Sequence, residues 1–357
     1  MRSSFRPENP KSHTSVARIA DDWYVACRSR DLRSSPRAVT ILGIPIVLFR
    51  TKAGEAAALI DRCPHRNVPL SAGRVTGERL QCAYHGWEFE KGGACACIPG
   101  LATDLDSKGK SAEAFPVREQ QDFVWVFATP GGVPGREPFR FPYTGEKGYF
   151  HSIQEREVDA SVHATAENAL DVPHTAYLHG GLFRSSKGRR TTIDVVVTRS
   201  AGSVSAEYVG EPRPKGIAAR IFAPGGGTVQ HVDRFILPSI AQVEYRLGAE
   251  TQFCVTNALT PVTDFHTRLT IMVSVRLPFP AWLVTPVVRP FLLKIFRQDA
   301  KMLALQTATI GTFGGEQFIS TQNDVLGPHI SRLMKQAEQG EREPAGPTLV
   351  RNLRMIV

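Results

Sequence analysis

Short runs of apolar residues, separated by turn residues, fill the first third of the chain. Between residues 23 and 127 these runs include DWYVACR, AVTILGIPIVLFR, AAALIDR and DFVWVFATP, with glycine and proline between them. Alternating apolar and polar positions with β-branched residues are typical of strands, and the Gly/Pro punctuation is typical of hairpins. This region is therefore predicted to form a small all-β domain.

The rest of the chain combines helical and strand-like patterns. Residues 161–178, SVHATAENALDVPHTAYL, form a helical stretch interrupted by Pro173, and residues 291–310 carry apolar residues at helical spacing. Strand-like segments lie between them: TTIDVVV, SVSAEYV, TVQHVDRFIL, IAQVEYRL, TQFCVTNAL and RLTIMVSVRL. This order predicts an α+β domain in which a large antiparallel sheet is framed by helices.

A Gly- and Pro-rich stretch at residues 129–142 separates these two regions. The predicted organisation is a flexible arm at 1–15, an all-β domain at 16–130, an α+β domain at 140–340 and a polar surface tail at 341–357. A length of 357 residues is consistent with two domains.

Composition excludes several classes of protein. With 42% hydrophobic and 22% charged residues, the chain is not collagen-like, coiled-coil or wholly disordered. The net charge of +9 is spread along the chain, which favours acidic partners over nucleic acid. The N-terminus lacks the apolar core of a signal peptide, and residues 277–296 carry prolines with Arg289 and Lys294. We therefore expect a cytoplasmic protein with at most a peripheral membrane contact.

Six cysteines are too few for a disulfide scaffold of this length, and their placement is uneven. Two of them begin short motifs, Cys63-Pro-His65 and Cys82-Ala-Tyr-His85. Each motif fits on one tight loop, and two such loops can hold a metal centre between them. Two thiolates and two imidazoles suit either zinc or an iron–sulfur cluster.

The composition of each motif helps to choose between these metals. A zinc finger usually places both cysteines in one pair and both histidines in the other. Mixed pairs allow one iron to take both thiolates and a second iron both imidazoles, as in a Rieske cluster. With Gly86-Trp87 after the second histidine, the block resembles the cluster-binding motif of Rieske proteins. Cys95 and Cys97, in contrast, are expected to be packing residues.

A second set of candidate metal ligands lies in ENALDVPHTAYLH, residues 167–179. His174 and His179 are slightly more than one helical turn apart, so both rings can face one point. Two histidines and a carboxylate form the facial triad of mononuclear iron(II) oxygenases. With Asn168 and Asp171 before the histidines, the stretch resembles the iron-binding motif of the Rieske non-haem iron oxygenases. The remaining histidines, His231 among them, are expected to be structural or solvent-facing.

The resemblance implies roles for two aspartates. In the family, an aspartate at the position of Asp171 hydrogen-bonds the iron-ligand histidine and, across a subunit boundary, a cluster-ligand histidine. Asp171 is therefore expected to position His174 and to bridge electron transfer.

The carboxylate ligand in the family comes from a C-terminal helix, in an acid-rich motif that ends in glutamine. The matching text is QDAKMLALQ, which makes Asp299 the expected ligand. Gln298 and Ala304 replace acids of the family pattern, so Asp324 remains the alternative.

The resemblance covers about residues 15–330 and implies a Rieske [2Fe-2S] domain followed by a helix-grip, START-like catalytic domain. It also implies an oxygenase component with a [2Fe-2S] cluster, a mononuclear Fe(II) and O2 as cosubstrate. Because the sequence contains no dinucleotide-binding fingerprint, electrons are expected from a ferredoxin or an NAD(P)H-dependent reductase. In the family, the cluster of one chain serves the iron of a neighbour, and this implies a homotrimer.

The sequence leaves the substrate open. The opening ADDWYVACRS resembles the group that acts on bulky natural products, and the apolar segment 282–296 could form a pocket wall. The main expectation is hydroxylation, demethylation or desaturation of a polycyclic or sterol-like compound. The alternative is a monooxygenase or O-demethylase of a small aromatic compound. A Rieske electron-transfer protein without oxygenase activity is the alternative of another class.

Overall fold

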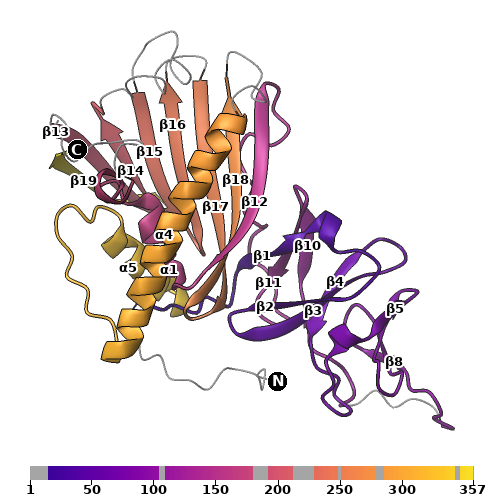
Figure 1. The fold of residues 1–357 in the computed structure, drawn as a ribbon. Coiled ribbons are helices and arrows are strands. Elements are labelled where there is room, and N and C mark those ends of the chain that lie inside the picture. The colour runs from indigo at the N-terminus through magenta and orange to yellow at the C-terminus, as the bar shows by residue number, and fades with distance from the viewer. Residues whose placement is uncertain are drawn as a thin grey trace. The chain divides into compact units, whose positions relative to one another are not determined.

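The computed structural model describes residues 15–103, 109–179, 192–211, 229–247, 251–277, 285–341 and 346–356. The chain divides into two compact units, each with its own hydrophobic core. The first contains residues 20–140 and 260–263, and the second contains 15–19, 141–259 and 264–357. Figure 1 shows the first in indigo to purple and the second in magenta to yellow.

The first unit is built from short antiparallel strands, as predicted. Its sheets have the strand orders β1-β11-β10, β2-β3-β4-β9 and β5-β6-β7-β8. The strands are β1 (Trp23–Arg28), β2 (Arg37–Ile41), β3 (Ile44–Arg50), β4 (Ala56–Ile60), β5 (Arg74–Thr76), β6 (Arg79–Gln81), β7 (Glu88–Phe89), β8 (Cys95–Cys97), β9 (Ala114–Phe115), β10 (Val117–Gln120) and β11 (Phe123–Phe127). Short 3-10 turns lie at Ser29–Asp31 and Leu70–Ala72.

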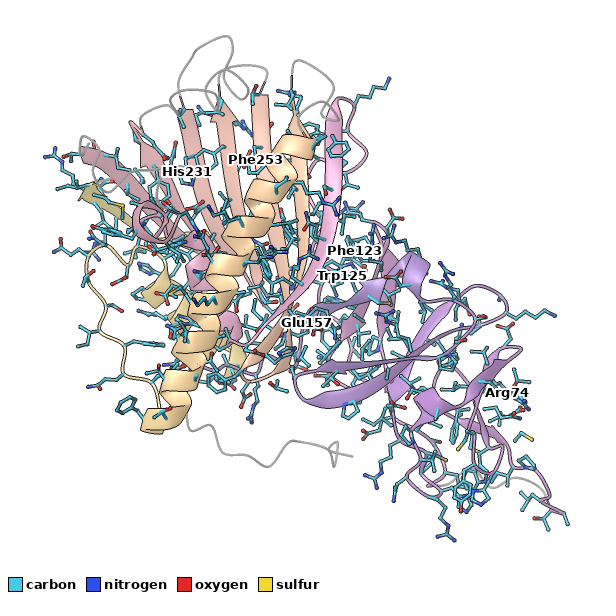
Figure 2. The ribbon with its side chains drawn as sticks, in the orientation of Figure 1. Arg74, Phe123, Trp125, Glu157, His231 and Phe253 are labelled. Carbon is cyan, nitrogen blue, oxygen red and sulfur yellow. The ribbon has the colours of Figure 1, made fainter. Side chains whose placement is uncertain are left out.

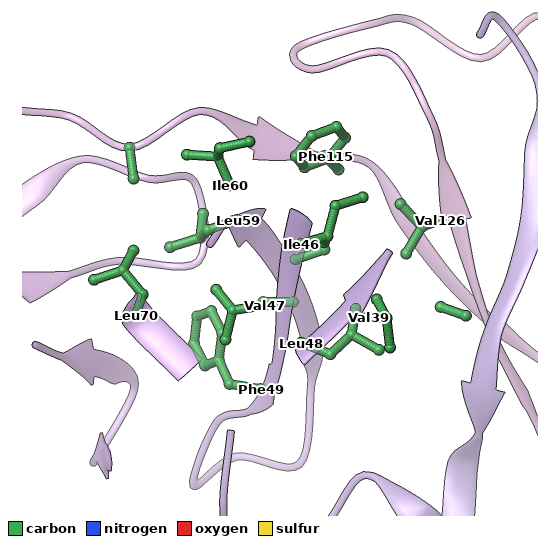
Figure 3. Close-up of a cluster of buried hydrophobic side chains, with 14 of the residues drawn as sticks. Val39, Ile46, Val47, Leu48, Phe49, Leu59, Ile60, Leu70, Phe115 and Val126 are labelled. Carbon is green, nitrogen blue, oxygen red and sulfur yellow. The ribbon is translucent and has the colours of Figure 1, made fainter. Parts of the chain in front are cut away.

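The core of the first unit lies around β3 and β4. Ile46, Val47, Leu48 and Phe49 of β3 are completely buried, and Leu59 of β4 packs with them (Figure 3). Both faces of β3 are therefore covered, which explains why its sequence reads as a continuous apolar run. This packing gives the loops that follow β4 and β6 a rigid base.

A close backbone approach between these loops requires a glycine. A Cβ on Gly73 would lie 2.0 Å from the carbonyl oxygen of Gln81, so any other residue would force the backbone apart. Gln81 immediately precedes Cys82, and this contact lies where β5 pairs with β6, beside the loop that begins at Cys82.

The second unit is a large antiparallel sheet with helices, which confirms the predicted fold class. The strand order is β12-β18-β17-β16-β15-β14-β13-β19. The strands are β12 (Tyr149–Val158), β13 (Thr192–Ser200), β14 (Ser203–Val209), β15 (Val229–Ile236), β16 (Ile240–Leu247), β17 (Thr251–Thr263), β18 (His266–Arg276) and β19 (Pro347–Ile356). The helices are α1 (Val162–Leu170), α2 (Thr175–Leu178), α4 (Thr285–Phe313) and α5 (Gly327–Glu338).

One face of this sheet, which we call the inner face, carries the core of the second unit. It presents Val195, Ala206 and Phe235, which pack with residues of α1, α4 and α5. Figure 1 shows α4 crossing in front of the sheet. The start of α1 is capped because the hydroxyl of Ser161 accepts a hydrogen bond from the Ala164 amide at 3.2 Å.

Strand β19 departs from the expectation of a polar surface tail at 341–357. It pairs with β13, with Leu353 opposite Val195, and Met355 is buried. Val350 and Ile356 are exposed on the same strand. An edge strand needs an apolar residue only at the positions that face the core, and the interspersed arginines concealed that pattern.

None of the described helices is long and apolar enough to cross a lipid bilayer. The longest, α4, contains Pro290 in its first part.

Candidate metal centres

The two loops of the first unit share one backbone design. In the loop after β4, the Cys63 amide donates to Val68 O at 2.9 Å, and the Asn67 amide donates to Cys63 O. In the loop after β6, the Cys82 amide donates to Trp87 O at 2.8 Å, and the Gly86 amide donates to Cys82 O. Each loop thus closes on its own cysteine and presents the histidine of its motif at the tip.

These loops bring the four predicted ligands together in two pairs. Cys63 and Cys82 are buried at 2% and 3% exposure, while the histidine rings lie 4.5 Å apart between centroids. Burial raises the pKa of the Cys63 thiol to about 11, and the adjacent Cys82 thiol adds to this effect. The His65 ring stacks on Trp87 at 4.7 Å, whereas His85 is exposed.

The donor set fits a two-iron cluster better than a single zinc ion. Nδ1 of His65 is buried and has no hydrogen-bond partner, which is expected of an atom that binds metal. The ligands of one zinc ion would lie within about 4 Å of one another. Among the described residues, three ligand atoms lie within 4.8 Å of one another at His174, His179 and Asp299. The cysteines and histidines of the two loops do not form such a group.

The second unit positions His174 and His179 on one short turn. Helix α1 ends at Leu170, and Pro173 separates it from α2, as the sequence predicted. The amides of Leu178 and His179 donate to His174 O and Thr175 O, so the chain makes one turn between the histidines. Their Nε2 atoms lie 3.3 Å apart, and their rings meet at 76°.

Asp299 of α4 completes this site. Its Oδ1 lies 3.1 Å from His179 Nε2 and 3.6 Å from His174 Nε2. The same Oδ1 is buried without a hydrogen-bond partner. Two imidazole nitrogens and an unpartnered carboxylate oxygen that converge in this way fit a divalent metal with open positions.

Charge also favours a cation at this point. Burial lowers the pKa of His174, but the neighbouring carboxylates of Asp171 and Asp299 outweigh burial and raise the pKa to about 9. The carboxylates around this ring therefore stabilise positive charge, which a bound metal would supply.

Two neighbouring side chains hold the histidine rings in orientation. Asp171 Oδ2 lies 3.2 Å from His174 Nδ1 and accepts from the His174 amide at the same distance. Gln298 Oε1 lies 3.0 Å from His179 Nδ1. From the sequence, Gln298 was only a departure from the family pattern. Its position next to Asp299 was the one indication that it could lie at the metal site. Both contacts leave Nε2 free for metal.

Asp324 does not join the triad. Its carboxylate accepts hydrogen bonds from the amide and the hydroxyl of Thr321. Asp324 instead helps to line a cavity of about 240 Å³, together with Asp171 and Tyr208. The remaining lining residues include Glu167, Asn168, Leu170, Pro173, Met302, Leu303 and Gln306. Asp299 is therefore the carboxylate of the metal site.

The apolar segment 282–296 is only partly described. Trp282 lies outside the described residues. Phe296 of α4 packs against the core of the second unit, and the Arg156 guanidinium carbon lies 6.0 Å from its ring centroid. The wall for a bulky substrate stays a prediction.

Comparison with known proteins matches the two units to two family descriptions. The Rieske [2Fe-2S] domain matches residues 22–116, and the vanillate O-demethylase oxygenase C-terminal domain matches residues 158–339. The second match alone spans half of the chain.

Individual relatives agree with these matches. The chain is 33% identical over 186 residues to the oxygenase component of dicamba O-demethylase from Stenotrophomonas maltophilia, covering 50% of this chain and 53% of the relative. It is 34% identical over 168 residues to the putative toluene-4-sulfonate monooxygenase system iron-sulfur subunit TsaM2 from Comamonas testosteroni, covering 45% and 46%. The chain thus spans about half the length of these curated relatives.

The fold has a close counterpart among solved structures. The crystal structure of dicamba monooxygenase bound to 3,6-dichlorosalicylic acid superposes with a TM-score of 0.77. The match covers 90% of this chain and 98% of that chain at 24% identity. At this identity, the likeness establishes the fold.

Proposed function

Because this chain belongs to the Rieske non-haem iron oxygenases, in the vanillate O-demethylase-like branch, we propose that it is the oxygenase component of a small-aromatic monooxygenase system. The favoured reaction is O-demethylation with dioxygen and externally supplied electrons. The convergence of His174, His179 and Asp299, with the unpartnered Asp299 Oδ1, is the observation that carries this proposal.

The comparisons favour a small aromatic substrate over the polycyclic or sterol-like one expected from the sequence. The two relatives described above are named for dicamba and toluene-4-sulfonate, which are both single-ring compounds. The segment that suggested a bulky pocket is only partly described, so no contact supports the larger substrate.

Iron and protein would have different roles at the metal site. Iron held by His174, His179 and Asp299 would supply dioxygen activation at its open positions. The protein supplies orientation: Asp171 accepts from Nδ1 of His174, and Gln298 accepts from Nδ1 of His179. Each bond fixes the tautomer in which Nε2 carries the lone pair for the metal.

The first unit is suited to electron relay. A [2Fe-2S] cluster on Cys63, Cys82, His65 and His85 would carry single electrons at a raised reduction potential. Trp87 holds the His65 ring by stacking, while Tyr84 and His85 are exposed at the loop tip. The exposed imidazole edge offers a short route for electrons into or out of this unit.

The same tip supports a proposal for the partners. Arg62 and Arg66 flank the first ligand loop and are exposed, so the tip would attract an acidic ferredoxin or reductase. By the family resemblance, the tip of one copy also delivers electrons to Asp171 and His174 of a second copy in a homotrimer. Asp171 is then the bridging residue between the two metal centres.

Iron analysis tests the proposed function. The loaded protein should contain about three irons per chain, two in the cluster and one in the mononuclear site. His174→Ala should remove one iron and leave the visible spectrum of the cluster unchanged. Two irons per chain that His174→Ala does not reduce would instead indicate an electron-transfer protein without oxygenase activity.

Oxygen uptake tests the substrate class. Uptake that depends on a reductase should be stimulated by methoxylated single-ring compounds, with formaldehyde as the product of the lost methyl group. Stimulation by polycyclic compounds alone would contradict the small-aromatic proposal.

A further inference from the structure

Tyr208, on the inner face of the large sheet, lies near the metal site. Together with Asp171 it lines the cavity of about 240 Å³, and Asp171 Oδ2 lies 3.2 Å from His174 Nδ1. Tyr208 also belongs to the core cluster that contains Leu170 of α1 and Leu303 of α4. A tyrosine ring and a residue that bonds an iron ligand therefore line the same small cavity.

The Tyr208 ring is enclosed by protein. It is 1% exposed, and burial raises its pKa well above the ordinary value of 10.0. The negative charges of Asp233 and Asp171 add to this effect. Tyr208 is therefore a neutral phenol at physiological pH. Because an oxidised phenol is a strong acid, Tyr208 can lose an electron only if a base accepts its proton.

A base for that proton lies beside the hydroxyl. The Tyr208 hydroxyl donates a hydrogen bond to Asp233, which is itself 1% exposed. Burial raises the pKa of Asp233 above its ordinary value, although His231 beside it acts in the opposite direction. A carboxylate with a raised pKa binds a proton more readily, so Asp233 is a better acceptor than a carboxylate in water.

His231 fixes the position of this base. Its Nε2 lies 2.9 Å from Asp233 Oδ1, and its Nδ1 lies 2.7 Å from Glu211 Oε2. Burial lowers the pKa of His231, but Asp233 and Glu211 outweigh burial and raise the pKa to about 9. The bond to His231 holds the Asp233 carboxylate in one place, as efficient proton transfer from Tyr208 requires.

The same histidine connects Tyr208 to a second tyrosine. Tyr208 of β14 lies opposite His231 of β15, and His231 lies opposite Tyr245 of β16. The His231 ring stacks on Tyr208 at 4.5 Å and on Tyr245 at 4.0 Å between centroids. Figure 2 labels His231 on the large sheet, and Tyr245 is partly exposed. Three stacked rings thus lead from a buried tyrosine to a partly exposed one.

We propose that Tyr208 is a redox-active tyrosine that protects the iron site when dioxygen is activated without a substrate. The O–H bond of Tyr208 then breaks, one electron goes to the oxidised iron site, and the proton goes to Asp233. The products are a neutral tyrosyl radical, a protonated Asp233 and an iron site reduced by one electron. This inference rests on the proposed function, because an oxygen-activating site supplies the oxidant.

The stack of rings returns Tyr208 to its resting form. An electron from a soluble one-electron reductant, such as ascorbate, enters at Tyr245 and reaches Tyr208 through the stacked His231 ring. The proton on Asp233 then returns to the phenolic oxygen of Tyr208. The net result is the reduction of the iron site by ascorbate, with Tyr208 and Asp233 unchanged.

Two other tyrosines separate the effect of proximity from the need for a base. Tyr177 of α2 lies between the two iron histidines in the chain, but it is 78% exposed. Tyr143 has a base, because its hydroxyl donates to Glu244 Oε1 at 2.7 Å. Glu244 alternates with Tyr245 along β16, so this pair lies on the other face of the sheet. Neither tyrosine combines proximity to the iron site with a buried base.

Hydrogen peroxide supplies the oxidising equivalents for the test. The loaded protein, oxidised and free of substrate, is mixed with peroxide and frozen at successive times, and a tyrosyl radical is measured by EPR. Ring-deuterated tyrosine should narrow the signal and so identify the residue type. Tyr208→Phe should remove the signal, whereas Tyr177→Phe and Tyr143→Phe should retain it. A radical that survives in Tyr208→Phe would overturn the proposal.

The rate of radical formation tests the role of Asp233. Asp233→Asn should slow formation of the radical by about 100-fold, within the range that a positioned base contributes. Asp194→Asn, an exposed change on β13, is the matched control and should leave the rate unchanged. An unchanged rate in Asp233→Asn would overturn the proposal.

A solvent isotope measurement covers the case in which Asp233→Asn does not fold. In the wild-type protein, the radical should form more slowly in D2O than in H2O, because the phenolic proton moves with the electron. Equal rates in the two solvents would show that no proton moves in this step, and would also overturn the proposal.

The decay of the radical tests the return route. Tyr245→Ala should slow the decay that ascorbate causes, because it removes the partly exposed ring of the stack. Phe253→Ala changes the partly exposed ring opposite Tyr245 on β17 and is the matched control. Equal decay in the wild type and in Tyr245→Ala would overturn the return route.

Failure of this inference differs from failure of the proposed function. His174→Ala lacks a ligand of the mononuclear iron and should form no radical with peroxide. A protein with about three irons per chain that forms no tyrosyl radical would overturn the inference and leave the proposed function intact. Absence of the mononuclear iron from the loaded protein would instead overturn the proposed function.

Discussion

The two metal centres use the same histidine chemistry but are assembled in different ways. The cluster site draws all its ligands from two loops between Cys63 and His85, and each loop closes on its own backbone hydrogen bonds. The iron site takes His174 and His179 from one turn, but Asp299 comes from a helix far along the chain. A site built from local loops depends on loop geometry, whereas the iron site depends on how α4 packs against α1.

This difference predicts that the two centres can be lost separately. The largest effect is expected for Cys82→Ser, which removes one of the two thiolates that attach the cluster to the protein. Visible absorption of the cluster should disappear, and iron should fall from about three to about one per chain. Loss of all three irons would show that the second unit needs the loaded first unit to bind its metal.

Asp299→Ala should have the converse effect. Iron should fall from about three to about two per chain, with the cluster spectrum intact and oxygen uptake lost. Asp324→Asn is the control, because Asp324 bonds Thr321 and lies outside the triad. It should retain about three irons, and a loss of iron in this control would contradict the assignment of Asp299.

Gln298→Ala sharpens the comparison by leaving every ligand in place. Without the bond to Nδ1, the His179 ring loses its preferred tautomer and orientation. Iron affinity of the mononuclear site should fall by about 10–100-fold, measured by competition with a chelator. Lys301→Ala, an exposed change on the same helix, should leave the affinity unchanged. An unchanged affinity in Gln298→Ala would show that the ring is held by packing alone.

His231 is a further buried histidine for this comparison. It cannot bind metal, because both of its ring nitrogens bond carboxylates. Its folded-state pKa of about 9 lies above the ordinary value of 6.5. A raised pKa adds stability that is complete below the unfolded value and is lost as pH rises through the folded one. Among the described residues, the groups that face the ring include Glu211, Asp233, Tyr208 and Tyr245.

The free energy of unfolding should therefore fall between about pH 6.5 and 9, by about 1–2 kcal/mol relative to His231→Gln. Urea unfolding at several pH values measures this difference. His151→Gln, at a ring that bonds Ser274 instead of a carboxylate, provides the matched comparison and should not reduce the slope. A wild-type slope equal to that of His231→Gln would contradict the raised pKa of His231.

Much of the fold and of the first metal centre could be read from local patterns. The alternating apolar runs predicted the strands, and Pro173 marked the break between α1 and α2. Strand β19 was missed because its arginines concealed a pattern in which Leu353 and Met355 face the core.

The contacts that the sequence did not reveal share one property, which is that the two partners are distant in sequence. Gln298 bonds His179, 119 positions away, and Glu211 bonds His231, 20 positions away. The sequence suggested only that His231 is structural or solvent-facing, because no ligand-like residue stands beside it in a recognisable motif. Charge pairs formed across strands leave no periodic signal along the chain.

The amino-acid sequence by itself determined the ligand chemistry of both centres, because ligand type and short spacing are local properties. It also determined the α+β class, through the change from period-two to helical spacing. The tertiary structure decided that Asp299 and not Asp324 completes the iron site, that Gln298 orients His179, and that His231 lies between two carboxylates. Each of these depends on which elements pack together, and packing of distant segments follows from the burial of the whole core.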